Sequence, residues 1–418
     1  MTNLAQTEVT VIGGGIFGLS AAYFLSKDGV NVILVERDRI GGGASNSNAG
    51  EISPGPSTPR SSEDHIMKES YEIYKHWNET RELKYDIELD EDVPVLACMR
   101  DEDFKMASGQ FIENLASSAS SSVLKRGEWQ IPEPNLADEF TWGVETRLTR
   151  INILRVCQGL RWAAETYGAN IQTHTTVTGI ESSGGKIRKV ITDKGAIKCE
   201  FVVNAAGAWA PVIGRMVGID IPIAGAIGQI LVTEPTQPLT NHLQVKHLPY
   251  WFQTDRPFIP YSGDPRKNLG IAGTVDYRPR EANYTIGRVE HPVELDETKT
   301  KVDTEPEALK FVAQAAIELI PQIRCLNVIR VYAGLRPICE VDGKPILGKV
   351  DEIDGFFIAG GGWHSGMSLG PASGKMISEL IREGETSIYI DEFNLSRFRN
   401  THQFPYGREF NLQRSRFA

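Results

Sequence analysis

The hydrophobic positions near the beginning of the sequence follow the order of a strand, a turn, a helix and a second strand. An apolar run rich in β-branched residues covers 9–12, and a helix-forming apolar segment covers 17–27. Gly29 ends that helix, and a second continuous apolar run covers 30–35. Such continuous runs are typical of strands buried on both faces of a parallel sheet. The pattern therefore predicts a β-α-β unit.

Four later segments are expected to be helices because their apolar residues recur at helical spacing. The first two of these helices would bury one apolar stripe each, formed by Ile66, Tyr71, Ile73, Tyr74 and Trp77 and by Ile153, Leu154, Leu160, Trp162 and Ala163. The four helices are expected over 62–83, 150–168, 306–319 and 368–382.

Strand-like runs dominate the regions between these helices. Short strands alternate with polar loops over 85–145. A small antiparallel sheet with turns at 184–185 and 194–195 is expected from the runs 170–173, 175–181, 187–192 and 196–203. A larger, mostly antiparallel sheet is expected from runs at 229–233, 250–253, 258–261, 269–275 and 328–332.

The β-α-β unit with its helices and the strand-rich regions together predict an α/β fold with a second, α+β part. A chain of 418 residues is long enough for two hydrophobic cores. The first domain is expected to be Rossmann-like and discontinuous in sequence, and the second to be built on the mostly antiparallel sheet. The first would comprise 1–83, 149–223 and 341–418, and the second 84–148 and 224–340.

The glycines between the first strand and helix carry the first chemical signal. Gly13, Gly15 and Gly18 stand at G-x-G-x-x-G spacing, and Glu36 ends the second strand. In a dinucleotide site the glycines permit a tight turn, close approach of a pyrophosphate and helix–strand packing, while the acidic residue accepts hydrogen bonds from the ribose. Glu36 would repel the 2′-phosphate of NADP. The alternative is a glycine-rich turn without a ligand.

Three further stretches of small residues could approach the same ligand. One is the loop 37–55, for which a flexible linker is the alternative interpretation. The others are Ala205 to Gly207 at the end of a predicted strand, and Gly360 to Gly362 before the last helix, whose N-terminus directs a positive dipole end forward. Ligand-facing loops this far apart favour a large cofactor, and FAD fits better than NAD.

Composition and charge exclude several classes of protein. The chain has 41% apolar and 23% charged residues, as in ordinary soluble globular proteins, and its net charge of -10 gives no reason to expect nucleic-acid binding. No apolar run reaches the length of a membrane span, and the N-terminal residues lack the pattern of a signal peptide. Five scattered cysteines without a C-x-x-C pair indicate neither disulfides nor a metal centre. We expect a cytoplasmic protein.

Five motifs together resemble those of the D-amino-acid oxidase or glycine oxidase (DAO) superfamily of FAD-dependent amine oxidoreductases. They occur in family order and span the chain. The chain particularly resembles the flavin subunits of sarcosine oxidase, hydrogen cyanide synthase, proline dehydrogenase and opine oxidase complexes. The motifs are GGGIFG with Glu36-Arg37, GGGASNSNAG at 41–50, VVNAAGAWA at 202–210, YAGLRPICEVDGKPILG at 332–348 and IAGGGWHSGMSLGPASGKMISELI at 358–381.

The resemblance implies a set of cofactor-binding residues. Around the ADP half of FAD it implies Gly13, Gly15, Ile16, Phe17, Gly18, Glu36, Arg37, Val177 (at the adenine), Ala205, Ala206, Gly207 and Trp209. Along the pyrophosphate and flavin it implies Gly43, Ala44, Ser45, Asn48, Ala49, Gly50, Glu51, Ile52, Gly334, Arg336, Gly361, Gly362, Trp363, His364, Ser365, Gly366, Met367 and Ser368. The loop near Ser45 contains no histidine for a covalent link, so noncovalent FAD is expected.

Four residues are candidates for the substrate site. Arg336 matches the position where glycine-oxidase-like enzymes place an arginine against the substrate carboxylate, which guanidinium binds in a bidentate manner. The alternative is a structural pair with Glu340 or Asp342. His364 would face the flavin or the substrate, or would be a structural histidine. Tyr250 and Tyr261 are candidates for the wall of the substrate pocket.

The predicted function is FAD-dependent oxidation of the C–N bond of an amino acid or N-substituted amino acid, by hydride transfer to flavin N5. The predicted setting is the catalytic subunit of a hetero-oligomeric dehydrogenase or oxidase. The alternatives are a free-standing oxidase that produces hydrogen peroxide and a structural subunit that binds FAD without turnover. An NAD-dependent dehydrogenase would leave the glycine loops at 41 and 360 unexplained.

The end of the sequence bears on partners. The segment 391–418 mixes aromatic residues with arginines, a composition common in protein interfaces. It either packs on its own domain or docks on a partner subunit that carries FMN or an iron–sulfur cluster. An FMN at the subunit interface is a further hypothesis from the resemblance.

Overall fold

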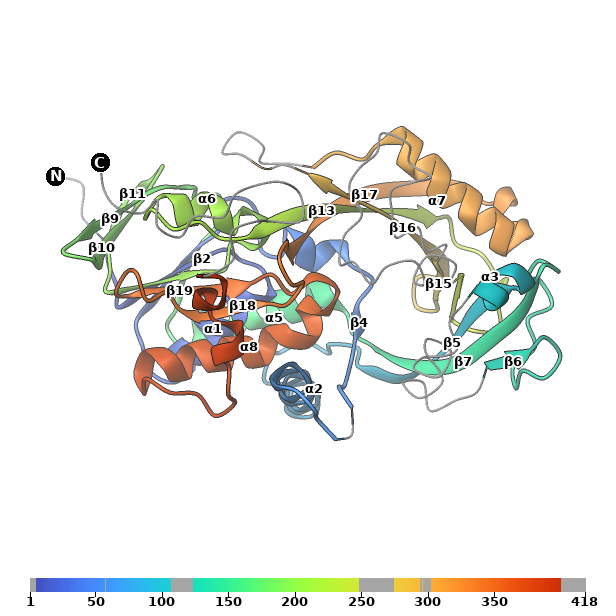
Figure 1. Cartoon of the computed structure of the whole chain (residues 1–418), viewed down its shortest axis with the longest axis horizontal. Helices are drawn as coiled ribbons and strands as arrows, with labels where there is room; N and C mark the ends of the chain where they lie inside the picture. Colours follow the sequence, from blue (N-terminus) through green and yellow to red (C-terminus); the bar gives the residue numbers. More distant parts are fainter. Residues whose placement is uncertain are drawn as a thin grey trace.

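The computed structural model describes residues 5–56, 58–106, 123–247, 274–293, 295 and 302–399. Its strands form three sheets (Figure 1), as the α/β fold prediction requires. Helices α1, α5 and α8 lie at one end of the molecule, and the largest sheet extends towards the other end (Figure 1).

The six-stranded sheet contains the predicted β-α-β unit. Its strand order is β18-β19-β12-β2-β3-β8, and every pair is parallel except β18 with β19. All residues of β2 and β3 are buried, which explains their continuous apolar sequences. The strands are β2 (Val9–Ile12), β3 (Val32–Val35), β8 (Asn170–Gln172), β12 (Phe201–Asn204), β18 (Ile346–Lys349) and β19 (Phe356–Gly360).

The helices of this part agree with the expected positions within a few residues. Two of the expected contacts are wrong, because Leu154 and Trp162 are 55% and 37% exposed on the outer side of α5. The predicted helix 150–168 also starts too early, because residues 150–152 precede α5. The helices are α1 (Ile16–Lys27), α2 (Ser62–Thr80), α5 (Ile153–Thr166), α6 (Ala210–Arg215) and α8 (Gly366–Arg382).

Glycines allow α8 to lie directly against α1. A Cβ atom on Gly370 would lie 2.6 Å from Cγ1 of Ile16, and one on Gly374 would overlap the side chain of Ser20. Within the first unit, a Cβ atom on Gly18 would overlap the carbonyl oxygen of Gly13. Helix α8 is thus held at the start of α1, although the two helices are far apart in the sequence.

The four-stranded sheet corrects part of the prediction. Its order is β1-β11-β10-β9, and the turns at 184–185 and 194–195 connect its strands as expected. The run at 170–173 was expected here, but β8 belongs to the six-stranded sheet. The run at 196–203 divides into β11, which belongs to the four-stranded sheet as expected, and β12, which joins the six-stranded sheet. A short apolar run does not encode which sheet it joins. The strands are β1 (Ala5–Gln6), β9 (Val177–Ser183), β10 (Lys186–Thr192) and β11 (Gly195–Lys198).

The nine-stranded sheet is mostly antiparallel, as predicted. Its order is β17-β13-β16-β15-β14-β5-β7-β4, with β6 also paired to β7, and only β14 and β5 run parallel. The region 85–145 differs from expectation because it contains two long strands of 11 residues. The strands are β4 (Glu51–Ile52), β5 (Asp90–Arg100), β6 (Val123–Lys125), β7 (Phe140–Arg150), β13 (Ile223–Thr233), β14 (Gln244–His247), β15 (Thr274–Arg278), β16 (Asn283–Val293) and β17 (Val328–Cys339).

Two helices accompany the nine-stranded sheet. Helix α7 (Pro306–Leu319) has the predicted bounds and packs on β13 and β16, and α3 (Asp101–Met106) follows β5. Some predictions lie outside the described residues, namely the strands at 250–253 and 258–261, most of that at 269–275, and the tail beyond 399.

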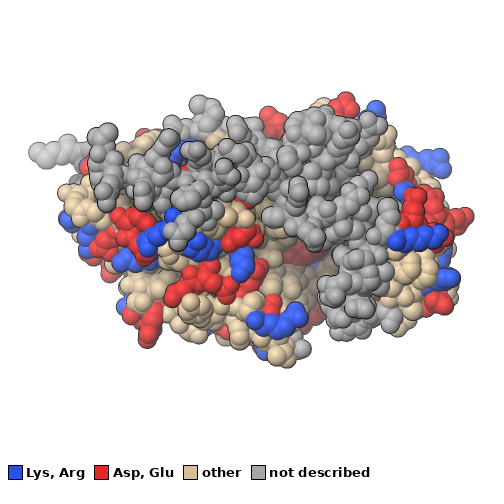
Figure 2. Space-filling view, viewed as in Figure 1, with Lys and Arg blue, Asp and Glu red and all other residues tan. Residues whose placement is uncertain are grey.

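On the face drawn in Figure 2, acidic and basic side chains are interspersed. Among the helices of the described residues, none combines the length and the apolar character needed to cross a membrane.

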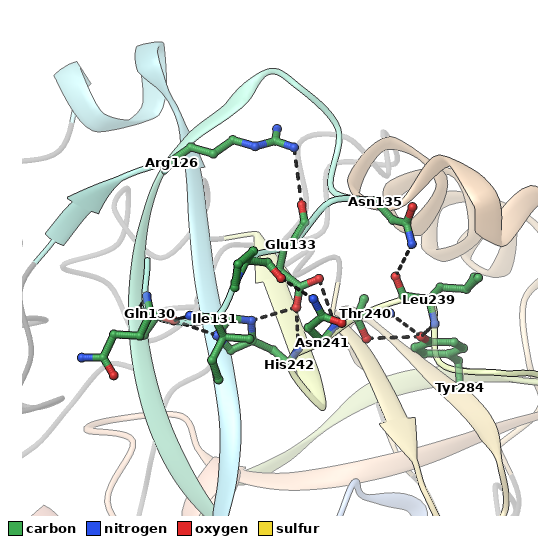
Figure 3. Close-up of polar contacts among 12 residues, drawn as sticks. Arg126, Gln130, Ile131, Glu133, Asn135, Leu239, Thr240, Asn241, His242 and Tyr284 are labelled. Atoms are coloured by element: carbon green, nitrogen blue, oxygen red, sulfur yellow. Dashed lines mark hydrogen bonds and ion pairs between the residues drawn. The ribbon is translucent and has the colours of Figure 1, made fainter. Parts of the chain in front are cut away.

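A buried histidine, His242 in the loop before β14, contacts Glu133 in the loop before β7 and Glu145 on β7 (Figure 3). Nδ1 of His242 lies 2.8 Å from Oε1 of Glu133, and its Nε2 lies 3.2 Å from Oε1 of Glu145. The side chains of His242 and Glu133 are 1% and 0% exposed.

Replacing His242 with leucine should lower the free energy of unfolding by about 3–5 kcal/mol, because Glu133 and Glu145 would lose the imidazole and keep only their backbone N–H donors in a buried site. Urea unfolding of the two proteins measures the difference. The same change at His65, which is exposed on α2, is the control and should have little effect. Equal losses for both variants would contradict a structural role for the His242 network.

Candidate active site

A cavity of about 1000 Å³ lies between the six-stranded and nine-stranded sheets. The last residues of β2, β3 and the segment after β12 form one wall, so the cavity opens at the carboxyl ends of parallel strands, where α/β folds bind ligands. Strands β13 to β17 form the opposite wall. Its volume lies at the upper end of the range for small-molecule sites.

The glycine turn has the geometry that a dinucleotide site requires. Gly13 has a φ angle of +111°, and a Cβ atom there would overlap the carbonyl oxygen of Ala205. Gly15 precedes the first residue of α1 and lines the cavity. The start of α1 therefore directs the positive end of its dipole at the cavity, although its Ile16 N–H is already bound by Ser45. Gly18 does not line the cavity and serves helix–strand packing instead.

Glu36 lies at the cavity wall and is held by two backbone amides. Its Oε2 accepts a hydrogen bond of 2.7 Å from the Gly14 N–H, and its Oε1 accepts one of 2.8 Å from the Asp38 N–H. Each carboxylate oxygen can accept a second hydrogen bond, so the group can also bind two ribose hydroxyls. The arrangement fits the adenosine half of FAD.

Replacing Glu36 with glutamine should weaken FAD binding by roughly 10- to 100-fold, since one charge-assisted acceptor is lost and an NH₂ group faces a backbone N–H. Activity at saturating FAD should change little. Fluorescence titration of the apoprotein with FAD measures the dissociation constant. Glu379 is a matched control, because its carboxylate also accepts a backbone N–H, from Ser387, but at an exposed site. Equal affinity of the Glu36 variant and the wild type would contradict the ribose role.

Arg37 and Trp209 face each other in the same part of the cavity. The guanidinium carbon of Arg37 lies 3.8 Å from the centre of the indole ring, which is a cation–π contact. Burial lowers the pKa of Arg37 from its usual value, while nearby Glu36 and Asp38 oppose this shift. Val177, Ala206 and Gly207 line the cavity beside this pair. The predicted nucleotide-binding residues are thus brought together.

The loop after β3 is ordered by its own polar groups rather than being a simple linker. Oγ of Ser45 accepts a hydrogen bond of 3.0 Å from the Ile16 N–H at the start of α1. The side chain of Asn48 donates to the Ser45 carbonyl at 2.6 Å and accepts from the Gly50 N–H at 2.7 Å. Gly50, with a φ angle of +80°, passes so close to Ile151 that a Cβ atom would overlap its carbonyl oxygen. These contacts hold the loop against the cavity.

The start of α8 forms another part of the wall. Trp363 and His364 lie in the short 3₁₀ helix η4 (Trp363–Ser365), with their rings 4.2 Å apart. Their neighbours fix the helix: Tyr74 donates a hydrogen bond of 2.9 Å to the carbonyl of Met367, and the Ser53 N–H donates one of 2.8 Å to Oγ of Ser368. The positive end of the α8 dipole is therefore directed at the cavity.

Strand β17 connects the loop near Ser47 with the substrate side of the cavity. A Cβ atom on Gly334 would overlap Ser47, so only glycine allows the loop to lie on this strand. Two residues further, the guanidinium carbon of Arg336 lies over Gly228 of the neighbouring strand, where a Cβ atom would be 3.7 Å away. Asp342, one alternative partner considered for Arg336, pairs with Arg397 at 2.9 Å.

Most of the predicted site residues line the cavity. They are Gly13, Gly15, Ile16, Phe17, Glu36, Arg37, Gly43, Ala44, Ser45, Asn48, Ala49, Glu51, Val177, Ala205, Ala206, Gly207, Trp209, Gly334, Arg336, Trp363, His364, Gly366 and Met367. Others are not among the lining residues of this cavity, namely Gly18, Gly50, Ile52, Gly361, Gly362, Ser365 and Ser368. These lie beside lining residues and support them. Tyr250 and Tyr261 lie outside the described residues.

Sequence reasoning missed much of the substrate-side wall. Tyr332 could have been found, since it precedes Gly334 by two residues and alternation places both on one face of a strand. No local signal marks the others, four of which lie on the short strands β14 and β15. They include Gln244, Lys246, Thr274, Asp276, Thr285 and Arg330. In the part of the chain that the structure describes, no group of histidine, cysteine or acidic residues is arranged to hold a metal ion.

The sequence pattern of the FAD dependent oxidoreductase (DAO) family matches residues 8–380. The chain belongs to this family. The motif-based prediction of the superfamily and of FAD as the cofactor is therefore confirmed, and the protein is an FAD-dependent oxidoreductase. The glycine turn, the Glu36 carboxylate and the size of the cavity all fit FAD, whose ADP half the residues around Glu36 would hold.

Two curated relatives match this DAO family member over nearly their whole length. Hydrogen cyanide synthase subunit HcnC of Pseudomonas protegens is 26% identical, over 94% of this chain and 96% of the relative. Glycine oxidase of Geobacillus kaustophilus is 26% identical, over 93% and 97%.

Solved structures show the same fold. The crystal structure of glycine oxidase from Geobacillus kaustophilus has a TM-score of 0.76 at 22% identity, covering 94% of this chain and 99% of the other. That of L-proline dehydrogenase from P. horikoshii has a TM-score of 0.73 at 23% identity, covering 95% and 99%. These similarities place the DAO fold on almost the entire chain.

Proposed function

We propose that this DAO family oxidoreductase oxidises the C–N bond of an amino acid or N-substituted amino acid. The observation that carries the proposal is the position of Arg336, which lies in the cavity over Gly228 and on the strand that also contacts the loop near Ser47. Relatives with names such as glycine oxidase and sarcosine oxidase subunit beta support an amine substrate.

The proposed roles of the residues follow from their places in the cavity. Arg336 would bind the substrate carboxylate and hold the neighbouring C–H bond towards the flavin. The start of α8, with His364, would lie at the flavin ring and favour negative charge there through the helix dipole. The residues around Gly13 and Glu36 would hold the ADP half. The division into an FAD-binding domain and a substrate domain, with the boundaries expected from sequence, belongs to this proposal.

The proposed reaction needs two co-reactants, FAD as the hydride acceptor and water for hydrolysis of the imine. FAD, when bound, takes up the hydride from the carbon that bears the nitrogen. The substrate nitrogen loses a proton, a C=N bond forms, and addition of water to this imine releases an oxo compound and an amine. The chain positions the neutral amine and limits the access of bulk water, so no separate acid–base pair is required.

The electron acceptor and the assembly form the second part of the proposal. The chain would act in the cytoplasm as one subunit of a complex, with a partner that carries FMN or an iron–sulfur cluster. The relatives HcnC and sarcosine oxidase subunit beta support this part of the proposal, because both are named as subunits. The start of the C-terminal segment packs on its own domain, since Phe393 and Phe398 are buried and Arg399 pairs with Asp351 at 2.7 Å. Docking of a partner would therefore involve residues beyond 399.

Anaerobic titration of the yellow holoprotein with amino acids, N-methyl amino acids and opines tests the proposal. One of these compounds should bleach the flavin absorbance. Fast recolouring in air with release of peroxide would identify a free-standing oxidase, and slow recolouring a dehydrogenase that needs its partner. A flavoprotein that no amine bleaches would contradict amine oxidation by this chain.

A further inference from the structure

Two buried arginines share one carboxylate beside the loop that follows β3. Asp276 on β15 forms an ion pair with Arg150, the last residue of β7, and another of 2.8 Å with Arg278, the last residue of β15. The side chains of Asp276, Arg150 and Arg278 are 2%, 9% and 18% exposed. Asp276 lines the cavity, whereas the two arginines are not among its described lining residues. The arginines therefore lie behind the wall.

Arg278 joins this cluster to the loop. Its Nη2 forms the ion pair with Asp276 and also donates a hydrogen bond to the carbonyl oxygen of Ala49. This nitrogen carries two N–H groups, so it can serve both oxygens at once. Ala49 itself lines the cavity, in the stretch of the loop that we expect beside the flavin. One side chain on β15 thus reaches from the nine-stranded sheet to a backbone group in the cofactor wall.

The loop is attached on both sides of Ala49. Before this residue, Oγ of Ser45 accepts a hydrogen bond of 3.0 Å from the first N–H group of α1. After it, the Gly50 carbonyl accepts one of 2.9 Å from the N–H group of the residue that follows β7. Arg278 supplies the hydrogen bond to the carbonyl between these two attachments. Its removal would therefore free the middle of the stretch while both ends stay in place.

The charges of the cluster strengthen the contact with the loop. The guanidinium donor is charged, and charge-assisted hydrogen bonds are roughly twice as strong as neutral ones. Burial raises the pKa of Asp276 to about 6, while Arg278 and Arg150 lower it because they favour the ionised form. Arg150 also donates a hydrogen bond of 3.4 Å to the carbonyl of Tyr277. Since Arg150 would remain on Asp276, loss of Arg278 would not leave the buried carboxylate without a partner.

We propose that Arg278 is a positioning residue for the cofactor. Through the Ala49 carbonyl it holds the loop in the position in which the loop contacts bound FAD, and Asp276 holds Arg278 in that orientation. The inference concerns the binding of FAD, the cofactor of the family, so it goes beyond the proposed amine oxidation and does not depend on it. The five sequence motifs include neither Arg278 nor Asp276.

Hydrogen exchange of the full-length apoprotein tests the contact with the loop before FAD is added. Replacing Arg278 with methionine should make exchange of the peptide 44–52 about 3- to 30-fold faster, which corresponds to the loss of one hydrogen bond. Replacing Asp276 with asparagine, which keeps the shape of the side chain, should increase the rate by a smaller factor. This second variant carries the test if the methionine variant does not fold. Unchanged exchange in either folded variant would overturn the proposal.

FAD binding tests the consequence for the cofactor. The Arg278→Met protein should bind FAD about 3- to 30-fold more weakly. At saturating FAD, its visible absorbance band should have less resolved shoulders, because the flavin is less enclosed. Arg278→Lys should restore part of both properties, since an ammonium group can donate to the carbonyl but lacks the planar fork. A methionine variant with lower thermal stability but with the FAD affinity and spectrum of the wild type would show a structural role only and overturn the proposal.

Arg280 is the matched control for Arg278. It lies two residues further along the chain, its side chain is 62% exposed, and it pairs with Glu88 at 2.9 Å. Its change to methionine removes the same charge and should leave the exchange of 44–52, the FAD affinity and the flavin spectrum unaltered. Equal changes in the two methionine variants would assign the effect to net charge rather than to the hydrogen bond with Ala49, and would overturn the proposal.

Discussion

Replacing Arg336 with methionine should lower kcat/KM for a carboxylate-bearing amine by roughly 10²- to 10³-fold, the effect of removing one partner from a desolvated ion pair. FAD should remain bound, because the substitution leaves unchanged the glycine turn and Glu36, which would hold the ADP half. Replacement with lysine should recover only part of the loss, since an ammonium group cannot form the bidentate contact. Stopped-flow reduction of the flavin measures the change directly.

The matched control for Arg336 is Arg188, which is exposed on β10 outside the cavity. Its change to methionine should leave kcat/KM unaltered. Comparison of glycine with methylamine adds a second readout, because the Arg336 variant should lose the preference for the compound with a carboxylate. If the variant retained this preference, Arg336 would be a structural residue and another group would bind the acid.

Replacing Gly13 with alanine should abolish detectable FAD binding, with a loss of affinity of at least about 10³-fold. The residue has a φ angle of +111°, which L-residues rarely adopt, and the added Cβ atom would overlap the Ala205 carbonyl oxygen. Relief of the overlap would move the end of β12 or the turn, and both belong to the nucleotide wall. The ratio of flavin to protein absorbance after purification measures the outcome.

Gly195 is a suitable control for this change. Its φ angle is +137°, yet a Cβ atom there would meet no atom within 4 Å. Alanine at 195 should therefore cost some stability in the hairpin and leave FAD content unchanged. A yellow Gly13→Ala protein with normal affinity would show that the turn does not carry the pyrophosphate.

The elements that sequence predicted well are those whose signal is local. The strand at 9–12, the helix after Gly15 and helix α7 each have a periodicity or a flanking glycine or proline that defines them. The assignment of β8 and β12 failed because strand pairing depends on residues far away in the sequence. Strand β14 has four residues and could not be distinguished from a loop.

The candidate site shows the same division. Glycines that approach the nucleotide, such as Gly13, have a spacing that can be recognised without a structure. Lys246 and Asp276 have no recognisable spacing in the sequence. They reach the cavity only because the folded sheet brings β14 and β17 to facing walls. Gly50 was assigned to the ligand, whereas the structure gives it a packing role against Ile151. Gly18 packs helix on strand, as its place in the glycine motif predicts.

The packing of α8 on α1 has a consequence for the biogenesis of the holoprotein. Ribosomes synthesise the glycine turn long before the wall residues His364 and Met367, and long before Gly374, which makes the close contact with Ser20. A nascent chain can therefore present only an open half of the nucleotide site. The complete wall around the cofactor therefore forms only after the segment that contains α8 has been synthesised and has packed on α1.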